Sequence, residues 1–446
     1  MRIVIAGAGE VGFHLAKMLA NENKDIILID NQEDKLEYAQ NHIDVLTIKG
    51  SATSLETLQE ADIKNAGLFI ALTHSEEINI TAAAISKKLG AKKTIARINS
   101  TQFLNNKEIF DLKDLGIDDM ISPESLVAKE LARLLKDSSV TDTVDFDDGK
   151  LQLFGVVLCD KSPIIGKTLI ECREKNMGPA SIVVAIHRDG ETLIPKGDAV
   201  FKLHDHIYYI ATEGGKDIAA YVSGKVKQII KTVMILGGSK TAVNVAKALS
   251  SKYNIKLVEG DKKKCFELAD NLQNVLVLNG DVRDVEFLED EGIHLMDALI
   301  SITGNSETNI ISCLVAKNHG VGKTIALVEN IDYINLSLDV GIDTMVNKKI
   351  IAANSIFKHI REGDVISVTG LHGIDAEVLE FEVHEGCKAH NKALNEMNFP
   401  ASAVVGGVIR DGIGYITMGD FVMQKGDHVV VFSLPECIKK VENLFK

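Results

Sequence analysis

Short apolar runs alternate with amphipathic stretches along the first 120 residues of the chain. Residues 2–6, RIVIA, are rich in β-branched side chains, which is typical of a buried strand. The next stretch places Val11, Leu15, Met18 and Leu19 on one face of a helix. The same alternation predicts further strands at 25–30, 45–48, 68–72 and 94–98. This pattern predicts a parallel, doubly wound sheet with a ligand crevice at the carboxyl ends of its strands.

Three glycines follow the first predicted strand. Gly7, Gly9 and Gly12 have G-x-G-x-x-G spacing, and Asp30 ends the second strand. In this context the first glycine forms a tight turn, the second admits a pyrophosphate and the third lets the helix approach the strand, while the acid accepts from ribose hydroxyls. We therefore predict a nucleotide site. The alternative is a tight strand-to-helix turn with a solvated Asp30.

A different pattern follows residue 120. Leucine and valine spacing predicts a helix near 125–136, and the acidic, turn-prone stretch 137–150 is expected to be a linker or a strand-edge boundary. Residues 151–212 are rich in predicted strands. These features predict a small α+β lobe after the large α/β lobe.

The chain is also a tandem repeat with an offset of about 230 residues. RIVIAGAGEVGFHLAK (2–17) aligns with TVMILGGSKTAVNVAK (232–247), and PASIVVAIHRDG (179–190) aligns with PASAVVGGVIRDG (400–412). We predict an α/β chain of two tandem units, each a Rossmann-like parallel-sheet lobe followed by a small α+β lobe. The expected boundaries are 1–120 and 231–350 for the large lobes, and 121–225 and 351–446 for the small lobes with their linker helices.

Further candidates in the first lobe follow the later strands. Small side chains at Ser51 and Ala52 suit a turn that approaches a ligand, and Thr73 and His74 follow the fourth strand. Arg97 lies in an apolar strand and needs an anion.

Two partners are open for Arg97. One is a ligand phosphate, and the other is an internal ion pair with Glu77 or Asp30. Glu77 and Asn79 themselves are expected to cap the following helix.

The second large lobe keeps only part of the fingerprint. Gly237 keeps the first glycine of the motif and Gly238 follows it, but Ser239 and Ala242 replace the second and third glycines. Glu259 aligns with Asp30 at the ribose position, so nucleotide binding here stays open. Leu327 replaces the fifth-strand arginine, while Asp281 and Thr303 align with two first-lobe candidates.

Composition restricts the function further. The chain has 446 residues, a formal net charge of −14, no tryptophan and 5% aromatic residues, which argues against nucleic acid as a partner. No apolar run reaches transmembrane length, and the six cysteines show no C-x-x-C pair, so we expect a cytoplasmic protein with reduced thiols.

Catalytic or metal-binding motifs are not evident. The run His204, Asp205 and His206 is better explained as a turn into a strand. The spacing of His384, Cys387 and His390 is explained by chance, so no metal site is expected. We find no general acid or base beside the nucleotide lobe, which makes the nucleotide a signal rather than a reactant.

The motifs together resemble a known family. IVIAGAGEVG with Asp30, ALTHSEEIN with its repeat ITGNSETNI, ARI ending at Ile98, the IxPExLVAKELARLL segment at 121–135 and the two P-A-S…R-D-G repeats are similar to the RCK (KTN) domain regulatory subunits of bacterial Trk potassium transporters. The resemblance covers essentially the whole chain.

That resemblance implies a cytoplasmic subunit that binds NAD(H), with ATP or ADP as a further ligand, and gates a membrane-embedded potassium transporter of the TrkH/TrkG type. It implies a homotetrameric ring docked on the inner face of the membrane. The expected cofactor-binding residues of both lobes are Gly7, Ala8, Gly9, Glu10, Val11, Gly12, Asp30, Ser51, Ala52, Thr73, His74, Arg97, Gly237, Gly238, Ser239, Glu259, Asp281 and Thr303.

Two other functions are compatible with the residues alone. One is an NAD-dependent oxidoreductase with a duplicated Rossmann fold, which would turn over NADH. The other is a repeat scaffold with vestigial pockets, which would tolerate Asp30→Ala.

Overall fold

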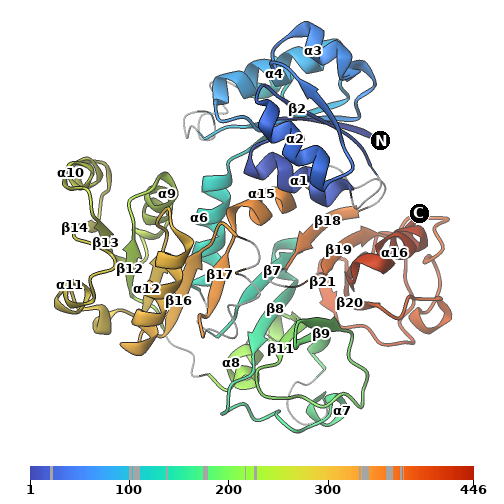
Figure 1. Ribbon diagram of the computed structural model, residues 1–446. Coiled ribbons are helices and arrows are strands. Elements are labelled where there is room, and N and C mark those ends of the chain that lie inside the picture. The colour runs from blue at the N-terminus through green and yellow to red at the C-terminus, as the bar shows by residue number, and fades with distance from the viewer. Residues whose placement is uncertain are drawn as a thin grey trace. The chain divides into compact units, whose positions relative to one another are not determined.

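The computed structural model describes residues 1–20, 24–99, 103, 111–136, 139–173, 179–215, 217–225, 229–330, 333, 341–357, 365–371, 374 and 376–446 (Figure 1). Two compact units emerge from its packing. The first comprises Met1–Val127 with Lys348–Ile360, and the second comprises Ala128–Asn347 with Arg361–Lys446. We describe each unit by itself.

The first unit is built on a six-stranded, entirely parallel sheet in the order β3-β2-β1-β4-β5-β6. Its strands are β1 (Arg2–Ala6), β2 (Asp25–Asp30), β3 (Leu46–Lys49), β4 (Leu68–Ala71), β5 (Lys93–Arg97) and β6 (Asp119–Ile121). The predicted strands are present within one or two residues. The sixth, β6, was not predicted because its three residues are too few to show a period.

Helices cover both faces of this sheet, so its central strands are apolar on both sides. They are α1 (Glu10–Ala20), α2 (Glu33–His42), α3 (Leu55–Glu60), α4 (Glu76–Leu89) and α15 (Lys348–Phe357), with short 3-10 turns at Ile63–Asn65 and Leu112–Leu115. Alternate residues of β1 belong to different cores: Ile3 and Ile5 pack with α1, whereas Val4 packs with α4.

Helix α15 comes from the second repeat, yet it completes the core of the first lobe. Its Ala352, Ala353 and Ile356 are fully buried in the same cluster as Ile3 and Leu15. The repeat pattern places this helix with the second small lobe, because sequence order shows nothing of which sheet a helix covers. The α6 helix (Pro123–Leu134), predicted near 125–136, spans the boundary between the two units.

The second unit contains a copy of the large sheet, with all strands parallel in the order β14-β13-β12-β15-β16-β17 (Figure 1). Its strands are β12 (Thr232–Leu236), β13 (Asn254–Glu259), β14 (Val275–Asn279), β15 (Ala298–Ser301), β16 (Lys323–Leu327) and β17 (Thr344–Val346). Its helices are α9 (Lys240–Leu249), α10 (Lys262–Asn271), α11 (Val285–Asp290) and α12 (Ser306–Asn318), with a 3-10 turn at Ile293–Leu295.

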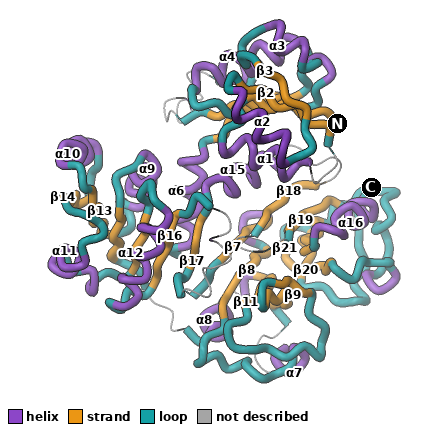
Figure 2. Tube along the Cα trace, viewed as in Figure 1, coloured by secondary structure: helices purple, strands orange, loops and turns teal. Residues whose placement is uncertain are grey.

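The small lobes are two antiparallel five-stranded sheets of matching order, β10-β9-β11-β8-β7 and β21-β20-β22-β19-β18 (Figure 2). The first has β7 (Asp142–Phe146), β8 (Leu151–Val157), β9 (Ser181–Arg188), β10 (Glu191–Leu193) and β11 (His206–Thr212), with α7 (Leu169–Cys172) and α8 (Ile218–Ser223). The second has β18 (Val365–Gly370), β19 (Glu377–Glu382), β20 (Ala403–Arg410), β21 (Ile413–Tyr415) and β22 (His428–Ser433), with α16 (Ile438–Phe445).

One sequence expectation for the small lobes needs correction. The stretch 137–150, expected as a linker or a strand-edge boundary, contains the edge strand β7 paired with β8. Its acidic residues hid the strand: Asp145 is exposed, whereas Val144 and Phe146 on either side are buried. The turn predicted at His204 is present, with a positive φ of 66°, and β11 starts at His206.

The two small lobes share one hydrophobic core. Tyr208 and Ile210 of β11 are fully buried in the same cluster as Val378 and Phe432 of the second small lobe. The Tyr208 and Phe432 rings lie 6.5 Å apart between centroids. The tandem α/β fold predicted from the sequence is confirmed, and the repeats are joined by this common core.

Candidate functional site

The glycine turn of the first lobe lies between β1 and α1. Gly7 has a φ of 111°, and a Cβ there would lie 2.9 Å from the carbonyl of Leu72. A Cβ on Gly12 would lie 1.9 Å from the Gly7 oxygen, so the protein itself requires both glycines. Gly9 differs, because its Cβ would meet only His74 Nε2 at 3.8 Å. Among the described residues, packing therefore does not require glycine at that position, and the turn presents bare backbone there.

Asp30 holds the turn in place. Its Oδ2 accepts the Ala8 N–H at 2.6 Å and its Oδ1 accepts the Gln32 N–H at 3.0 Å. A carboxylate has about four lone-pair positions, so one remains on each oxygen for a ribose diol. Gly50 donates its N–H to the Asp30 carbonyl at 2.9 Å, which brings the turn carrying exposed Ser51 and buried Ala52 alongside.

The end of β4 is fixed by a buried amide. Asn79, only 1% exposed, accepts the Thr73 N–H at 2.9 Å and donates to the Arg97 carbonyl at 2.9 Å. Asn79 therefore joins β4 to β5 and does not cap α4, contrary to the sequence expectation. The cap is Ser75, whose hydroxyl oxygen accepts the Ile78 N–H. Asn309 makes the equivalent bonds in the second lobe.

Arg97 has a partner that the sequence did not indicate. Its Nη2 lies 3.2 Å from Oε1 of Glu124, rather than beside Glu77 or Asp30. Lys348 of α15 pairs with the same carboxylate oxygen. Burial tends to raise the pKa of Glu124, but the hydrogen bond from Lys348 and the charges of Lys348 and Arg97 outweigh it and lower that pKa.

Glu10 also contacts α15. Its Oε2 lies 3.2 Å from Nζ of Lys349, so two successive lysines hold α15 to the first lobe. Val11 is buried in α1 and offers a ligand only backbone, and His74 is exposed after β4. Ion pairs thus link Arg97, at the carboxyl end of β5, through Glu124 to α15. The residues of this network are far apart in the sequence.

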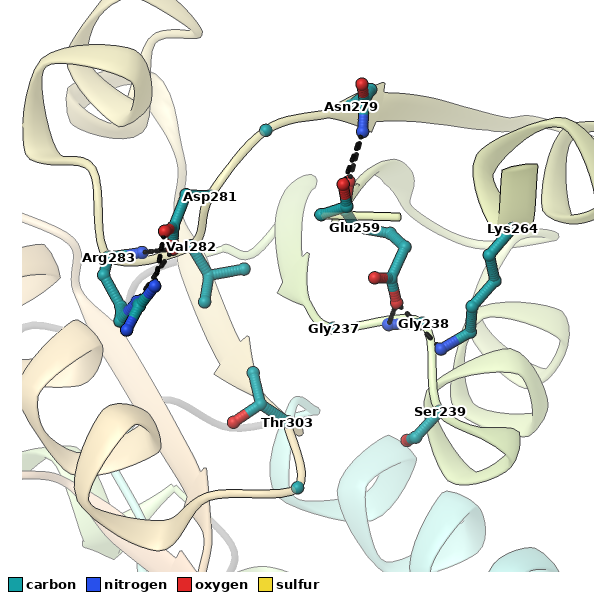
Figure 3. A pocket seen from close by; sticks show the side chains of 13 residues that line it. Gly237, Gly238, Ser239, Glu259, Lys264, Asn279, Asp281, Val282, Arg283 and Thr303 are labelled. Atoms are coloured by element: carbon teal, nitrogen blue, oxygen red, sulfur yellow. Dashed lines mark hydrogen bonds and ion pairs between the residues drawn. The ribbon is translucent and has the colours of Figure 1, made fainter. Parts of the chain in front are cut away.

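A cleft of about 540 Å³ opens at the matching position of the second lobe (Figure 3). It lies at the carboxyl ends of β12, β13, β14 and β15, where an open α/β sheet binds its ligands. The lining residues are Gly237, Gly238, Ser239, Glu259, Gly260, Lys264, Asn279, Gly280, Asp281, Val282, Arg283, Thr303 and Gly304. All six second-lobe candidates from the sequence line this cleft.

Glu259 repeats the geometry of Asp30. Its Oε2 accepts the Gly238 N–H at 2.8 Å and its Oε1 accepts the Asp261 N–H at 3.0 Å. Lys264 adds a third partner, with Nζ 2.9 Å from Oε2. Burial tends to raise the pKa of Glu259, but these N–H donors and the Lys264 ammonium more than offset it and lower that pKa.

Ser239 has a structural role in addition to lining the cleft. Its Oγ accepts the Ala242 N–H at 3.2 Å, which caps α9, and donates to the Ile302 carbonyl at 3.2 Å. A side chain therefore stands where Gly9 leaves bare backbone in the first lobe.

The sequence did not predict seven of the lining residues, and three of these seven have polar side chains: Lys264, Asn279 and Arg283. The repeat register could have found them, because Lys264 aligns with Lys35 and Arg283 with Thr53. Asn279 donates to the Glu259 carbonyl at 3.0 Å, and Arg283 forms an ion pair with Asp281 at 2.8 Å.

Comparison with known proteins now identifies the family. A family model described as the TrkA-N domain matches residues 3–123 and 233–348, and a TrkA-C domain model matches 378–446. The chain belongs to the TrkA family. It is 33% identical to the Trk system potassium uptake protein TrkA homolog 1 of Methanosarcina mazei, with 100% of both chains covered. It is also 33% identical to the Trk system potassium uptake protein TrkA of Haemophilus influenzae, covering 100% of this chain and 99% of the relative.

Solved structures share the fold of this TrkA family member. The crystal structure of the GsuK RCK domain aligns with a TM-score of 0.62 and 16% identity, covering 100% of this chain and 94% of that one. The GsuK channel bound to NAD gives the same TM-score and identity and covers 100% of this chain and 78% of that one. The family identification and the fold agree with the resemblance drawn from the motifs.

The repeated R-D-G segments have a structural role. Arg188 binds Asp205 through two hydrogen bonds of 2.6 Å, and Arg410 binds Asp427 through two of 2.7 Å. Each aspartate is almost fully buried, and each pair fixes the turn before the last long strand of its small lobe. Among the residues described, no helix is long and apolar enough to cross a membrane.

Proposed function

We propose that this chain is a nucleotide-sensing regulatory subunit of a potassium uptake system, with no enzymatic turnover of its own. The observation that carries the proposal is the repeated pairing of a strand-end acid with a glycine-turn N–H, at Asp30 with Ala8 and at Glu259 with Gly238. NAD(H) is the expected ligand of the first lobe, with ATP or ADP as a further ligand. Full-length relatives named as potassium uptake proteins, and the NAD-bound GsuK channel of the same fold, support it.

Helix α15 offers a physical route from ligand to response. It follows β17 of the second large lobe directly in the chain, yet its Lys349 pairs with Glu10 on the glycine-turn helix. A bound anionic nucleotide would compete for Lys349 and Arg97 and change how firmly α15 is held. A ligand shifts such an equilibrium only by its differential affinity for the two states, about 1–3 kcal/mol for ordinary allosteric coupling.

The partner in this proposal is a membrane-embedded potassium transporter subunit of the TrkH/TrkG type. The regulatory chain would assemble as a homotetrameric ring and reach the inner face of the membrane through that partner. Its net charge of −14 makes direct attraction to anionic lipid unfavourable, which is consistent with recruitment by protein contacts.

The first test is potassium flux through the reconstituted complex of this chain and its transporter, with NAD⁺, NADH, ADP or ATP added. We expect flux to depend on the nucleotide, and Asp30→Ala to weaken the NAD(H) response about ten-fold or more by removing a charged acceptor. Asp34→Ala, an exposed acid on α2, is the matched control and should leave the response unchanged.

Two outcomes would contradict the proposal. Flux that ignores every nucleotide, with unchanged binding in Asp30→Ala, would favour the scaffold. A change in NADH absorbance with a small substrate would instead favour an oxidoreductase.

A further inference from the structure

Two cationic side chains flank the second-lobe cleft. Lys264 and Arg283 lie on opposite sides of it, each paired with a carboxylate that also lines the cleft (Figure 3). The Arg283 and Asp281 side chains are 73% and 49% exposed, so their ion pair is weak and easily exchanged for another partner. The Lys264 side chain is 41% exposed, which leaves its ammonium reachable from the cleft.

The two acids at the strand ends differ in how many hydrogen-bond acceptor positions remain for a ligand. Asp30 accepts two backbone N–H groups. Glu259 accepts two as well and also pairs with Lys264, so three of about four lone-pair positions are used. A ribose diol can engage both oxygens of Asp30 directly. To do the same at Glu259 it must displace Lys264, whose charge then needs another anion.

The phosphate-facing side of the cleft also differs between the lobes. Gly9 presents bare backbone in the first lobe, whereas Ser239 presents a side chain that caps α9. This change removes a bare-backbone contact for any diphosphate, so that phosphate binding in the second cleft depends more on its cations. The turn at 281–283 carries the cation Arg283, whereas the equivalent turn at 51–53 of the first lobe has Thr53 at that position and no cation.

We propose that the second lobe binds an adenine nucleotide with a terminal phosphate group, ADP or ATP, in preference to NAD(H), and that Lys264 and Arg283 select it. The inference rests on the proposed function and deepens it by assigning different ligands to the two lobes. The ribose takes Glu259 while Lys264 transfers its ion pair to a phosphate. Polyphosphate chains carry more negative charge than the NAD(H) pyrophosphate and so gain more from two cations.

Isothermal titration can separate the lobes. Asp30→Ala leaves the second site intact and Glu259→Ala leaves the first, so titrating each with ADP, ATP, NAD⁺ and NADH gives an affinity profile per lobe. We expect the Asp30→Ala protein to bind ADP and ATP at least ten-fold more tightly than NADH. In the Asp30→Ala protein, adding Lys264→Met should weaken the affinity for ADP about ten-fold or more, because a charge-assisted hydrogen bond to phosphate is lost.

Lys263→Met is the matched control, because this neighbouring lysine is exposed and does not line the cleft. It should leave ADP affinity unchanged, and Arg283→Gln should lower it. Circular dichroism and retained NADH binding in the first lobe, measured without the Asp30→Ala change, verify that each variant is folded.

Two results would overturn the inference. Tighter nucleotide binding in Lys264→Met would show that the lysine only competes with ribose for Glu259. NADH binding as tight as ADP in the Asp30→Ala protein would show that the second lobe does not discriminate. In either case, NADH binding to the first lobe and gating by NADH would still support the proposed function. If the wild-type protein bound no nucleotide at all, both the proposed function and this inference would be wrong.

Discussion

At the scale of single residues, the two large lobes differ in the acid at the end of their second strand and in the glycine-turn residue that this acid contacts. The first lobe pairs Asp30 with Ala8, and the second pairs the longer Glu259 with Gly238. The exchange is coupled, because a Cβ on Gly238 would lie 2.6 Å from Oε2 of Glu259. The carboxylate of the longer glutamate therefore lies too close for a methyl group at position 238, whereas Asp30 leaves room for the methyl group of Ala8.

This coupling makes Gly238→Ala destabilising, by about 1–3 kcal/mol, because a close-packed site must rearrange. Adding Glu259→Asp should recover part of the loss. Recovery will be incomplete, since Leu268 Cδ1 would also lie 2.7 Å from the new Cβ. A double-mutant cycle by urea unfolding measures the interaction, and strictly additive effects would contradict it.

At the scale of elements, the lysine that α15 brings to α1 helps to lower the pKa of a histidine. His14 on α1 is mostly removed from solvent, and burial together with the charges of Lys17 and Lys349 lowers its pKa to about 4. The sequence places His14 on the helix but does not show that the charge of Lys349 acts on it, because that lysine lies more than three hundred residues away.

The lowered pKa predicts acid sensitivity of the first unit. Between pH 6.5 and pH 4 the unfolded chain binds a proton at His14 that the folded chain does not, so stability falls as the pH falls through this window. We expect a contribution of about 2 kcal/mol between pH 8 and pH 5. His14→Gln should reduce the pH dependence of the unfolding free energy by that amount.

Urea unfolding at pH 5 and pH 8 makes the measurement, and His42→Gln on the exposed surface of α2 serves as the control. If wild type and His14→Gln lost equal stability on acidification, His14 would have to be protonated in the folded chain.

At the scale of the whole molecule, the two repeats are joined through their small lobes. Tyr208, Ile210, Val378 and Phe432 are all fully buried in one cluster drawn from both sheets. One apolar face of each small sheet is covered by the other sheet, whereas further apolar side chains of each lobe pack in a cluster of their own.

Phe432→Ala should therefore destabilise both small lobes together. We expect a loss of about 3–5 kcal/mol, the cost of truncating a buried phenylalanine. Phe266→Ala, whose ring is on a residue 65% exposed, should change stability by no more than about 0.5 kcal/mol. Differential scanning calorimetry should show the transition of the small lobes shifting as one. Separate transitions for the two sheets would argue against a shared core.

The sequence alone determined those features of the protein that depend on residues close together in the chain. Local periodicity and the repeat predict the large-lobe strands up to Lys93–Arg97, the glycine turn, the equivalence of Asp30 and Glu259, and the family. Each of these features needs only a few consecutive residues, so its signal is local.

Only the tertiary structure decided which distant groups meet. Arg97 and Lys348 both pair with Glu124, and Asn79 bridges two strands instead of capping a helix. In the second cleft, Lys264 forms an ion pair with Glu259. Burial and ion pairing depend on how elements pack, and packing brings together residues whose separation along the chain carries no period. For that reason the sequence indicated where a second nucleotide site is expected, while the side chains proposed to select its ligand came from the fold.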